Sequence, residues 1–374
     1  MKKFLSLSIC LVLMLSLISC GKSDNSSSNT TKKSTTTATK NNNFEKPPTF
    51  TLSWNLGNTL DACQVWGDIS DHPTPEEQET GWNNPLTTQE IVDKVANTGF
   101  ECVRVPVTWG LQLEEDNGKY TIKKDWLDRV KEVVDYCVKA DTYVIVNMHH
   151  DDQSWLNISA NDNDWKKIKD KYKQIWEQIA EEFKDYDEHL ILEAANEITA
   201  TTKFDGCGDS DTDKCWWGHN QEAFDRINEL YKIFVDTVRS TGENNSKRYL
   251  MLPTYGAQWY DNQIDKLVIP NNDKHIIMDI HWYQADFYDK EKNRWVFELM
   301  KNYRDKNGIS VILGETGVQK ANTSEKNISF GENVVKLAEE YNIPVCLWDD
   351  GGDMQLLDRR TLKWNDEKFI NGLF

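Results

Sequence analysis

The sequence of 374 residues lacks the features of several common protein classes. It has 43 Lys and Arg against 61 Asp and Glu, a formal net charge of −18, so it has no basic excess for binding nucleic acid. It has no Cys-x-x-Cys pair and no Cys/His spacing of a zinc site, and we expect neither a metal nor an organic cofactor. No Gly-x-Gly-x-x-Gly follows the first predicted strand, which argues against a dinucleotide-binding sheet.

The apolar run at residues 4–18 is too short and too early for a membrane-spanning helix. It follows two lysines, as a secretory signal does. Leu-Ile-Ser before Cys20 resembles the bacterial lipoprotein cleavage box, so we expect residues 1–19 to be a lipoprotein signal peptide and Cys20 to be lipidated. The alternative is an ordinary signal peptide that happens to end in Cys. We therefore expect an extracellular or cell-surface protein that meets the membrane only through Cys20.

Two parts follow the signal peptide. Residues 20–43 are Ser, Thr, Asn and Lys with almost nothing apolar, which predicts a flexible low-complexity tether. Residues 44–374 carry the apolar patterns of one folded domain, without an internal repeat or a second linker.

The cysteines of the folded part differ in their surroundings. Cys102, Cys137 and Cys346 lie in apolar strand or helix patterns, where a small buried thiol is usual. Cys207 and Cys215 flank a polar loop, and outside the cell they could form a disulfide.

Strand and helix patterns alternate along the folded domain. The predicted strands are 50–55, 100–106, 143–148, 190–194, 248–253, 275–280, 310–313 and 345–348. The predicted helices include 88–98, 126–139, 165–183, 221–239, 294–306 and 332–341, with weaker patterns after the fifth and eighth strands. Eight apolar strands separated by helices favour an α/β fold of the (β/α)8 TIM barrel type over a doubly wound sheet.

Polar side chains follow these strands at the end where a barrel gathers its functional groups. They are Asn55, Asn58, Arg104, His149, His150, Asn196, Glu197, His281, Tyr283, Glu315, Trp348 and Asp349. Core packing would not select such a set, so the sequence predicts a site at this mouth.

Glu197 and Glu315, after the fourth and seventh strands, form an obvious acid and base pair. Glycoside cleavage needs one carboxyl group to protonate the leaving oxygen and a second to attack or to activate water. We expect Arg104 and Tyr283 to keep Glu315 ionised through hydrogen bonds, and burial to raise the pKa of Glu197.

The same residues have structural interpretations. Arg104 could be an ordinary salt-bridge partner, and Glu315 could cap a turn. The pair His149 and His150 could bind a metal or form a capped core pair, but no third ligand is evident nearby. These interpretations weaken because all the residues fall at one end of the same predicted barrel.

Several segments, taken in order, resemble glycoside hydrolase family 5, and most of all its endoglucanase and xyloglucanase branch, sometimes called subfamily 4. The segments are Asn55–Asp61, Glu79–Pro85, Val103–Gly110, Asn147–Asp151, Ala195–Glu197, His281–Tyr283 and Gly314–Thr316. They span nearly the whole folded domain, and the ordered set is highly specific. The resemblance implies a single catalytic domain that hydrolyses internal β-1,4 bonds of a glucan (cellulose, mixed-linkage glucan or xyloglucan) by a retaining double displacement.

The resemblance also implies roles for individual residues. By motif position, Glu197 is the acid/base and Glu315 is the nucleophile. Asn196 would face the 2-hydroxyl of the sugar at the cleavage point, and Trp348 would stack under that sugar. The other substrate-binding residues would be Asn58, Arg104, His149, His150, His281 and Tyr283.

Two positions depart from the family pattern. Ile198 stands where the family commonly has Pro, and this change should be tolerable because Pro only rigidifies the loop. Asp350 stands where the family commonly has Asn, and this change could alter a sugar contact and hence fine specificity.

The 15 Trp residues are many for one chain, and their positions suggest two uses. We expect a few of those near strand ends to stack on sugars: Trp66, Trp82, Trp109, Trp155, Trp216, Trp217 and Trp259. We expect those in helices to pack against the barrel: Trp126, Trp165, Trp176 and Trp295.

The expected partner is thus a β-glucan polysaccharide or oligosaccharide, bound by a monomer. A mannanase or xylanase on the same barrel is the alternative among enzymes. A surface glycan-binding lipoprotein is the alternative outside enzymes, but a binder would not need Glu197 and Glu315.

Overall fold

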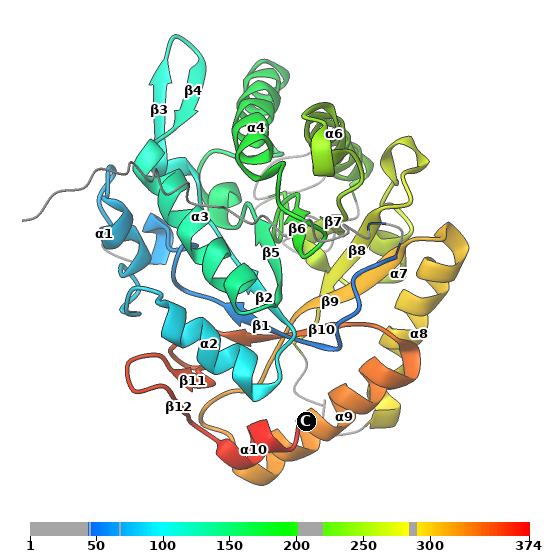
Figure 1. The fold of residues 1–374 in the computed structure, drawn as a ribbon. Helices are drawn as coiled ribbons and strands as arrows, with labels where there is room; N and C mark the ends of the chain where they lie inside the picture. Colours follow the sequence, from blue (N-terminus) through cyan, green and yellow to red (C-terminus); the bar gives the residue numbers. More distant parts are fainter. Residues whose placement is uncertain (1–43, 45, 67–68, 201–219, 284–289) are drawn as a thin grey trace, which may run out of the picture. The chain divides into compact units, whose positions relative to one another are not determined.

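Eight strands close into a barrel in the order β1-β10-β9-β8-β7-β6-β5-β2 (Figure 1). Their bounds are β1 Leu52–Leu56, β2 Cys102–Val105, β5 Tyr143–Asn147, β6 Leu190–Glu193, β7 Leu250–Pro253, β8 Ile276–His281, β9 Ser310–Thr316 and β10 Val345–Asp349. All neighbouring strands are parallel, and β1 pairs with both β2 and β10, which closes the sheet. The predicted TIM barrel is confirmed, and the doubly wound alternative is wrong.

This computed structural model describes residues 44, 46–66, 69–200, 220–283 and 290–374. The signal region, the tether, Cys207, Cys215, Trp216 and Trp217 lie outside the described residues, so the predictions for them stay predictions. Within the described ranges, no helix has both the length and the apolar character needed to cross a membrane.

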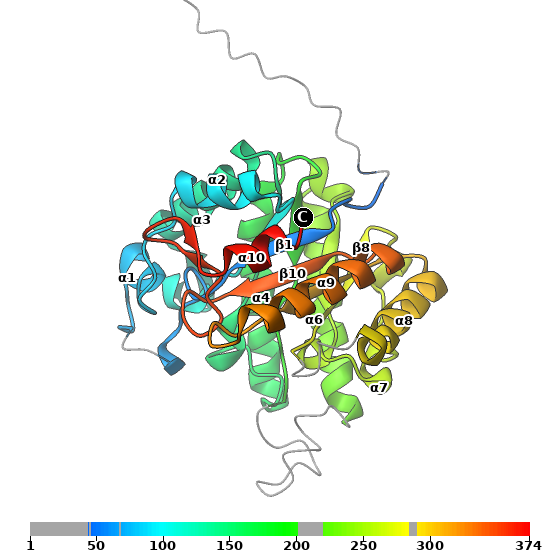
Figure 2. The same ribbon diagram turned by 90° about the horizontal axis from the view of Figure 1, so that it is seen from below.

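Helices surround the barrel on its outer side (Figures 1 and 2). The long ones are α2 Gln89–Thr98, α3 Lys124–Lys139, α4 Asp162–Phe183, α6 Gln221–Ser240, α8 Lys290–Asn307 and α9 Ser324–Tyr341. The short ones are α1 Pro75–Glu79, α7 Asp261–Ile264 and α10 Glu367–Asn371. All six predicted helices are confirmed, and the weak patterns after the fifth and eighth strands correspond to α7 and α10.

The helix α9 begins earlier than the sequence pattern predicted. Thr323 caps it by accepting a hydrogen bond from the backbone N–H of Lys326. Gly331 lies inside the helix, where a glycine lowers the intrinsic propensity and hides the periodic pattern. A Cβ at Gly331 would approach Leu373 within 2.8 Å, so this glycine permits the close packing of α9 against the C-terminal segment.

Two antiparallel hairpins were not predicted. Strand β3 (Leu113–Asp116) pairs with β4 (Lys119–Ile122), and β11 (Leu357–Asp358) pairs with β12 (Lys363–Trp364). The first hairpin turns at Asn117 and Gly118, which both have positive φ angles. Asn-Gly with this geometry is a strong hairpin signal, but the charged residues on both sides obscured the strands.

The interior of the barrel is apolar at one level. Its side chains are Phe50, Cys102, Ile145, Ile191, Tyr249, Met251, Ile277, Ile312 and Cys346. The buried thiols of Cys102, Cys137 and Cys346 are confirmed. Because side chains of a strand alternate between its two faces, the residues two positions further along also point inward. On β2, β5, β6 and β8 these are Arg104, Asn147, Glu193 and Asp279, which form the floor of the site.

Arg248, which precedes β7, is fully buried at the opposite end of the barrel. Its guanidinium group donates to the backbone carbonyls of Phe183, Tyr186, Asp187 and Leu190. Arg248→Met should lower the free energy of unfolding by roughly 3–5 kcal/mol, because these carbonyls would lose their donors inside the protein. Denaturant unfolding measures the loss. A change within about 0.5 kcal/mol, as expected for the exposed control Lys139→Met, would contradict this account.

Candidate active site

Arg104 is the centre of the polar layer inside the barrel. It is fully buried, and all five of its N–H groups have acceptors. Two parallel hydrogen bonds of 2.7 Å join it to Glu193. The remaining donors contact Asn55 Oδ1 at 3.0 Å, Glu315 Oε1 at 2.7 Å and Asn196 Oδ1 at 3.0 Å. The prediction that Arg104 contacts Glu315 is confirmed, and the salt-bridge interpretation is also correct, since Glu193 is its bidentate partner.

Glu193 was missed by the sequence analysis. Its carboxyl group is fully buried, and burial raises its pKa although the charge of Arg104 opposes that rise. Burial alone would lower the pKa of Arg104, but the charge of Glu193 holds that pKa well above its usual range. The signal was a single Glu at the end of the apolar run Leu190–Ala194, where an unpaired charge would be costly.

Glu315 lies in β9, with both carboxyl oxygens engaged. Arg104 contacts Oε1, and the hydroxyl of Tyr283 donates to Oε2 at 2.8 Å. Only 5% of the surface of Glu315 is exposed, so these two bonds replace solvation by water. Burial and the negative charge of Glu315 raise the pKa of Tyr283, which therefore stays protonated and remains a donor. The contacts expected for Glu315 are thus present.

Glu197 follows β6 and contacts His281. The distance from His281 Nδ1 to Glu197 Oε1 is 2.7 Å, and the distance from the same nitrogen to Glu315 Oε2 is 3.6 Å. The other nitrogen, Nε2, lies 3.1 Å from Asp279 Oδ2. Burial alone would lower the pKa of His281, but the charges of Glu315 and Asp279 hold it well above the usual range. His281 is therefore a cation between three carboxylates.

The expectation that burial raises the pKa of Glu197 is wrong for the open site. Burial does favour the neutral carboxyl group, but the hydrogen bond and the charge of His281 outweigh it and lower the pKa of Glu197. The side chain of Glu197 is also 42% exposed, which limits the effect of burial. The sequence placed His281 at the site but did not indicate that it would contact Glu197.

The two glutamates lie close together. One oxygen of each, together with a nitrogen of His281, belongs to a group of atoms that all lie within 4.8 Å of one another. A short separation leaves no room for a water molecule between an attacking carboxylate and the intact substrate.

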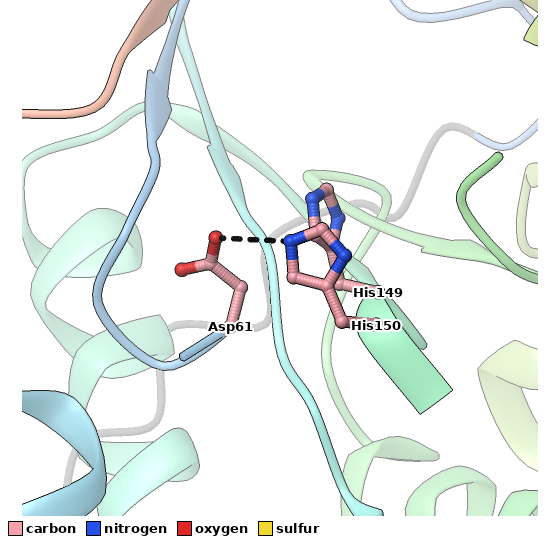
Figure 3. Close-up of side chains that lie close together, drawn as sticks. All are labelled: Asp61, His149 and His150. Carbon is pink, nitrogen blue, oxygen red and sulfur yellow. Dashed lines mark ion pairs between the residues drawn. The ribbon is translucent and has the colours of Figure 1, made fainter. Parts of the chain in front are cut away.

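His149 and His150 follow β5, and the loop after β1 brings Asp61 to them (Figure 3). His150 Nε2 lies 4.0 Å from Asp61 Oδ2. Burial lowers the pKa of His150 to about 4, so the ring is neutral at physiological pH. Burial also lowers the pKa of His149, to well below its usual value. Asp61 lies in the segment Asn55–Asp61, but the sequence pattern indicated no role for it.

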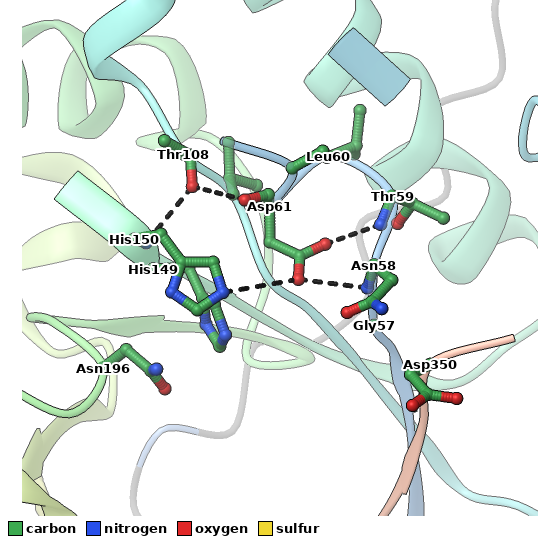
Figure 4. Close-up of polar contacts among 12 residues, drawn as sticks. Gly57, Asn58, Thr59, Leu60, Asp61, Thr108, His149, His150, Asn196 and Asp350 are labelled. Carbon is green, nitrogen blue, oxygen red and sulfur yellow. Dashed lines mark hydrogen bonds and ion pairs between the residues drawn. The ribbon is translucent and has the colours of Figure 1, made fainter. Parts of the chain in front are cut away.

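Asp61 organises the loop that carries Asn58 (Figure 4). Its carboxyl oxygens accept hydrogen bonds from the backbone N–H groups of Asn58 and Thr59. Its carbonyl accepts from the hydroxyl of Thr108, which in turn accepts from the backbone N–H of His150. Burial raises the pKa of Asp61 to about 7, against these hydrogen bonds. Through its carboxyl group and its backbone carbonyl, Asp61 thus couples the loops after β1, β2 and β5.

An open cleft of about 1030 Å³ lies over these groups. Of the ten predicted site residues, eight line it: Asn58, His149, His150, Asn196, Glu197, Tyr283, Glu315 and Trp348. Arg104 and His281 lie directly beneath and contact the two glutamates. The structure therefore brings all ten together. It adds Trp82, Gln319, Asn322, Lys326 and Met354, which the sequence did not assign to the central site.

The tryptophans divide differently from the prediction. Trp82 and Trp348 line the cleft, and the ring of Trp348 lies parallel to that of His149 at 5.7 Å. Trp109 is fully buried and donates to Asn147 O, so it is a core residue and not a stacking platform. Trp126, Trp165 and Trp176 pack in the core as predicted. Trp295 is 42% exposed, so its predicted packing is wrong in part, although its ring contacts Trp259 and Trp282.

The two departures from the family pattern have structural outcomes. Ile198 is buried in the core cluster, so an apolar side chain replaces the rigid proline. Asp350 Oδ1 accepts hydrogen bonds from the backbone N–H groups of Gly352 and Met354. In the described part of the cleft Asp350 is not a lining residue, and its side chain instead shapes the loop after β10.

Some carboxylates and histidines of this site lie close enough to share a cation. They form the groups Asp61, His149 and His150; Glu193, Asp279 and His281; and Glu197, His281 and Glu315. In each group the negative charge already has a partner, because Arg104 binds Glu193 and Glu315 while backbone amides bind Asp61. The expectation that no metal takes part stays a prediction.

A TIM barrel with two facing glutamates, one held by Arg104 and Tyr283 and one by His281, has the layout of a glycoside hydrolase. Comparison with known proteins extends this conclusion. The family model "Cellulase (glycosyl hydrolase family 5)" matches residues 65–353. The chain belongs to this family.

Three individual proteins illustrate this similarity. Endoglucanase A of Clostridium longisporum is 34% identical over 337 residues, which cover 84% of this chain and 62% of that protein. The GH5-4 broad specificity endoglucanase from Ruminococcus champanellensis, with bound cellotriose, is 34% identical and has a TM-score of 0.78. The match covers 87% of this chain and 95% of that chain. A family 5 xyloglucan-specific endo-β-1,4-glucanase from a metagenomic library, also with cellotriose, is 34% identical, with coverages of 87% and 96% and a TM-score of 0.76.

The ion pair between His281 and Glu197 makes a direct prediction. His281→Gln removes the positive charge beside Glu197, so the pKa of Glu197 should rise, because its ionised form loses a stabilising partner. Carbon-13 NMR titration of the glutamate side chains measures this pKa. The control His189→Gln alters a similar His–Asp contact before β6 and should leave the pKa of Glu197 unchanged. An unchanged or lower pKa in His281→Gln would show that His281 does not set it.

Proposed function

We propose that the protein is an endo-acting β-1,4-glucanase that retains the anomeric configuration. The observation that carries the proposal is the short distance between the glutamates, with one oxygen of each within 4.8 Å of the other. Retaining glycosidases have carboxyl groups about 5–5.5 Å apart, whereas inverting enzymes need about 6.5–9.5 Å to admit water.

Glu315 is the nucleophile in this mechanism. Arg104 and Tyr283 each donate a hydrogen bond to one of its oxygens, so the carboxyl group is oriented towards the cleft. Asn196, fixed through Arg104, faces the same part of the cleft and is suited to the 2-hydroxyl of the bound sugar. Trp348 offers a flat face on which that sugar can stack.

Glu197 is the acid and then the base. In the open site His281 is a cation that contacts Glu197 Oε1, so the pair holds one proton between its two members. That proton passes to the leaving oxygen as the glycosidic bond breaks. The His281–Glu197 pair has then lost one proton, and it recovers one from the water molecule that hydrolyses the glycosyl-enzyme, with Glu197 as the base.

The volume of the cleft, about 1030 Å³ between the described residues, suits a chain of sugars better than a single small glycoside. The two structural relatives described above were solved with cellotriose, and one of them is described as xyloglucan-specific, which supports a β-glucan as the substrate. The match covers only 62% of Endoglucanase A of Clostridium longisporum, so the similarity applies to the catalytic barrel and not to the whole of that protein.

The two roles predict different behaviour of two variants. With an activated aryl glycoside, Glu197→Ala should still form the glycosyl-enzyme, because a good leaving group needs no proton, and azide should restore turnover. Glu315→Ala should form no covalent species with either kind of substrate. Both variants should lose several powers of ten on polysaccharide, because neither role has a nearby substitute.

Steady-state kinetics with and without azide distinguishes these outcomes, and the exposed control Glu177→Ala should behave like the parent. Rescue of Glu315→Ala to a product of retained configuration, or no rescue of Glu197→Ala, would contradict the roles.

We also propose that the enzyme is a lipoprotein at the cell surface, anchored by Cys20. The support is the sequence alone: a basic start, an apolar run and Leu-Ile-Ser before the cysteine. The polar tether of residues 20–43 would let the barrel reach a polymer away from the membrane.

Replacing Cys20 with Ser should release the enzyme from the membrane fraction without lowering its specific activity, since the anchor takes no part in the cleft. Cell fractionation and activity assays measure both quantities. Retention of the variant in the membrane fraction would contradict the lipoprotein proposal, and Cys10→Ser is the matched control that should stay anchored.

A further inference from the structure

A second cavity, of about 400 Å³, lies beside the cleft. The segment between β9 and α9 borders both, since Val318 and Asn322 line the cleft on one side and the cavity on the other. The opposite wall comes from the loop after β10 and from α10. The size falls in the range of small-molecule sites, and the shared lining residues Val318 and Asn322 place the cavity next to the cleft.

The lining of this cavity is amphipathic. Leu356 and Phe369 contribute buried apolar side chains, while Asn327, Gln355 and Asn365 contribute amides. A pyranose ring has apolar C–H faces and a rim of neutral hydroxyl groups that both donate and accept hydrogen bonds. Amides match that rim, because each side chain carries a donor and an acceptor.

Asn327 in particular has an unused acceptor. Its side chain is 5% exposed, and its Oδ1 accepts no hydrogen bond from the described residues. Its Nδ2 lies 3.4 Å from Asp366 Oδ2, which fixes the orientation of the amide. A buried acceptor without a donor costs about 1–3 kcal/mol of stability. A ligand hydroxyl that donates to Asn327 Oδ1 would therefore offset this cost, which would favour binding.

The charges favour a neutral ligand. Asp366 lines the cavity, and its carboxylate accepts from the Ser324 hydroxyl and from the backbone N–H of Phe369. The ammonium group of Lys320 is bound by Gln355 Oε1 at 2.6 Å. A phosphate or carboxylate ligand would approach Asp366 closely, whereas a sugar would not be repelled.

We propose that this cavity binds a pyranose unit of the same glucan whose backbone lies in the cleft. The proposal rests on the proposed glucanase function. This pyranose unit could belong to the main chain of the glucan, several sugars away from the cleavage point, or to a glycosyl branch attached to that chain.

The test uses two variants of the full enzyme. Asn327→Ala removes the unused acceptor, and Gln355→Trp fills the cavity with a bulky ring while leaving α9 intact. The matched control is Asn163→Ala, an exposed amide in the first turn of α4. Each enzyme is assayed on branched xyloglucan, on unbranched mixed-linkage glucan and on an aryl cellobioside, which reaches only the region near the glutamates.

KM for the polymer that uses the cavity should rise roughly 2- to 10-fold in both variants, as expected for the loss of one or two neutral hydrogen bonds, with kcat unchanged. A rise on xyloglucan alone identifies a branch as the occupant, and a rise on both polymers identifies the distant backbone. The aryl cellobioside should not be affected.

Unchanged KM on both polymers in Gln355→Trp would overturn the proposal, as would an equal rise on the aryl cellobioside, which would mean that the cleft itself was disturbed. Failure of the glucanase function is recognised separately, because the parent enzyme would then hydrolyse neither polymer.

Discussion

The buried guanidinium group of Arg104 is the interaction on which the site depends. A fully buried cation is tolerated only when its donors are satisfied and its charge is balanced, and Arg104 meets both conditions through Glu193, Glu315, Asn55 and Asn196. Because these partners come from β1, β6, β9 and the loop after β6, one side chain fixes the relative positions of four segments around the barrel mouth. One oxygen of the nucleophile proposed here is therefore held from the interior of the barrel by Arg104, and the other is held by Tyr283, which follows β8.

The second constraint is the order of charges across the site. Carboxylates of Glu193, Glu315, Asp279 and Glu197 alternate with the cations of Arg104 and His281. Each cation is shared, so the protonation of one glutamate depends on its neighbours. Arg104 and Tyr283 hold Glu315, whereas Glu197 is held by His281 alone among the described contacts and is partly open to solvent. Two carboxyl groups of one residue type thus have different environments, which is what an acid/base and a nucleophile require.

The barrel fold and the identity of most site residues could be predicted from the sequence, because both depend on local patterns. Apolar strand runs define the barrel, and polar residues directly after them must lie at its mouth. The sequence was insufficient where contacts between distant segments decide the outcome. Glu193 looked like part of an apolar strand, and its pairing with Arg104 spans 89 positions. The lowered pKa of Glu197 depends on His281, 84 positions away. Trp109 is buried although it follows a strand, and Trp295 is partly exposed although it lies in a helix, because exposure is set by the neighbouring elements.

In the proposed mechanism Glu315 forms the covalent bond to the sugar, while Glu197 donates and then accepts the proton. Incubation with a 2-fluoro glycoside, which slows hydrolysis of the glycosyl-enzyme, followed by intact-protein mass spectrometry and peptide mapping, tests it most directly. We expect one label for each chain, on the peptide that contains Glu315. A label on Glu197, or on any residue other than Glu315, would contradict it.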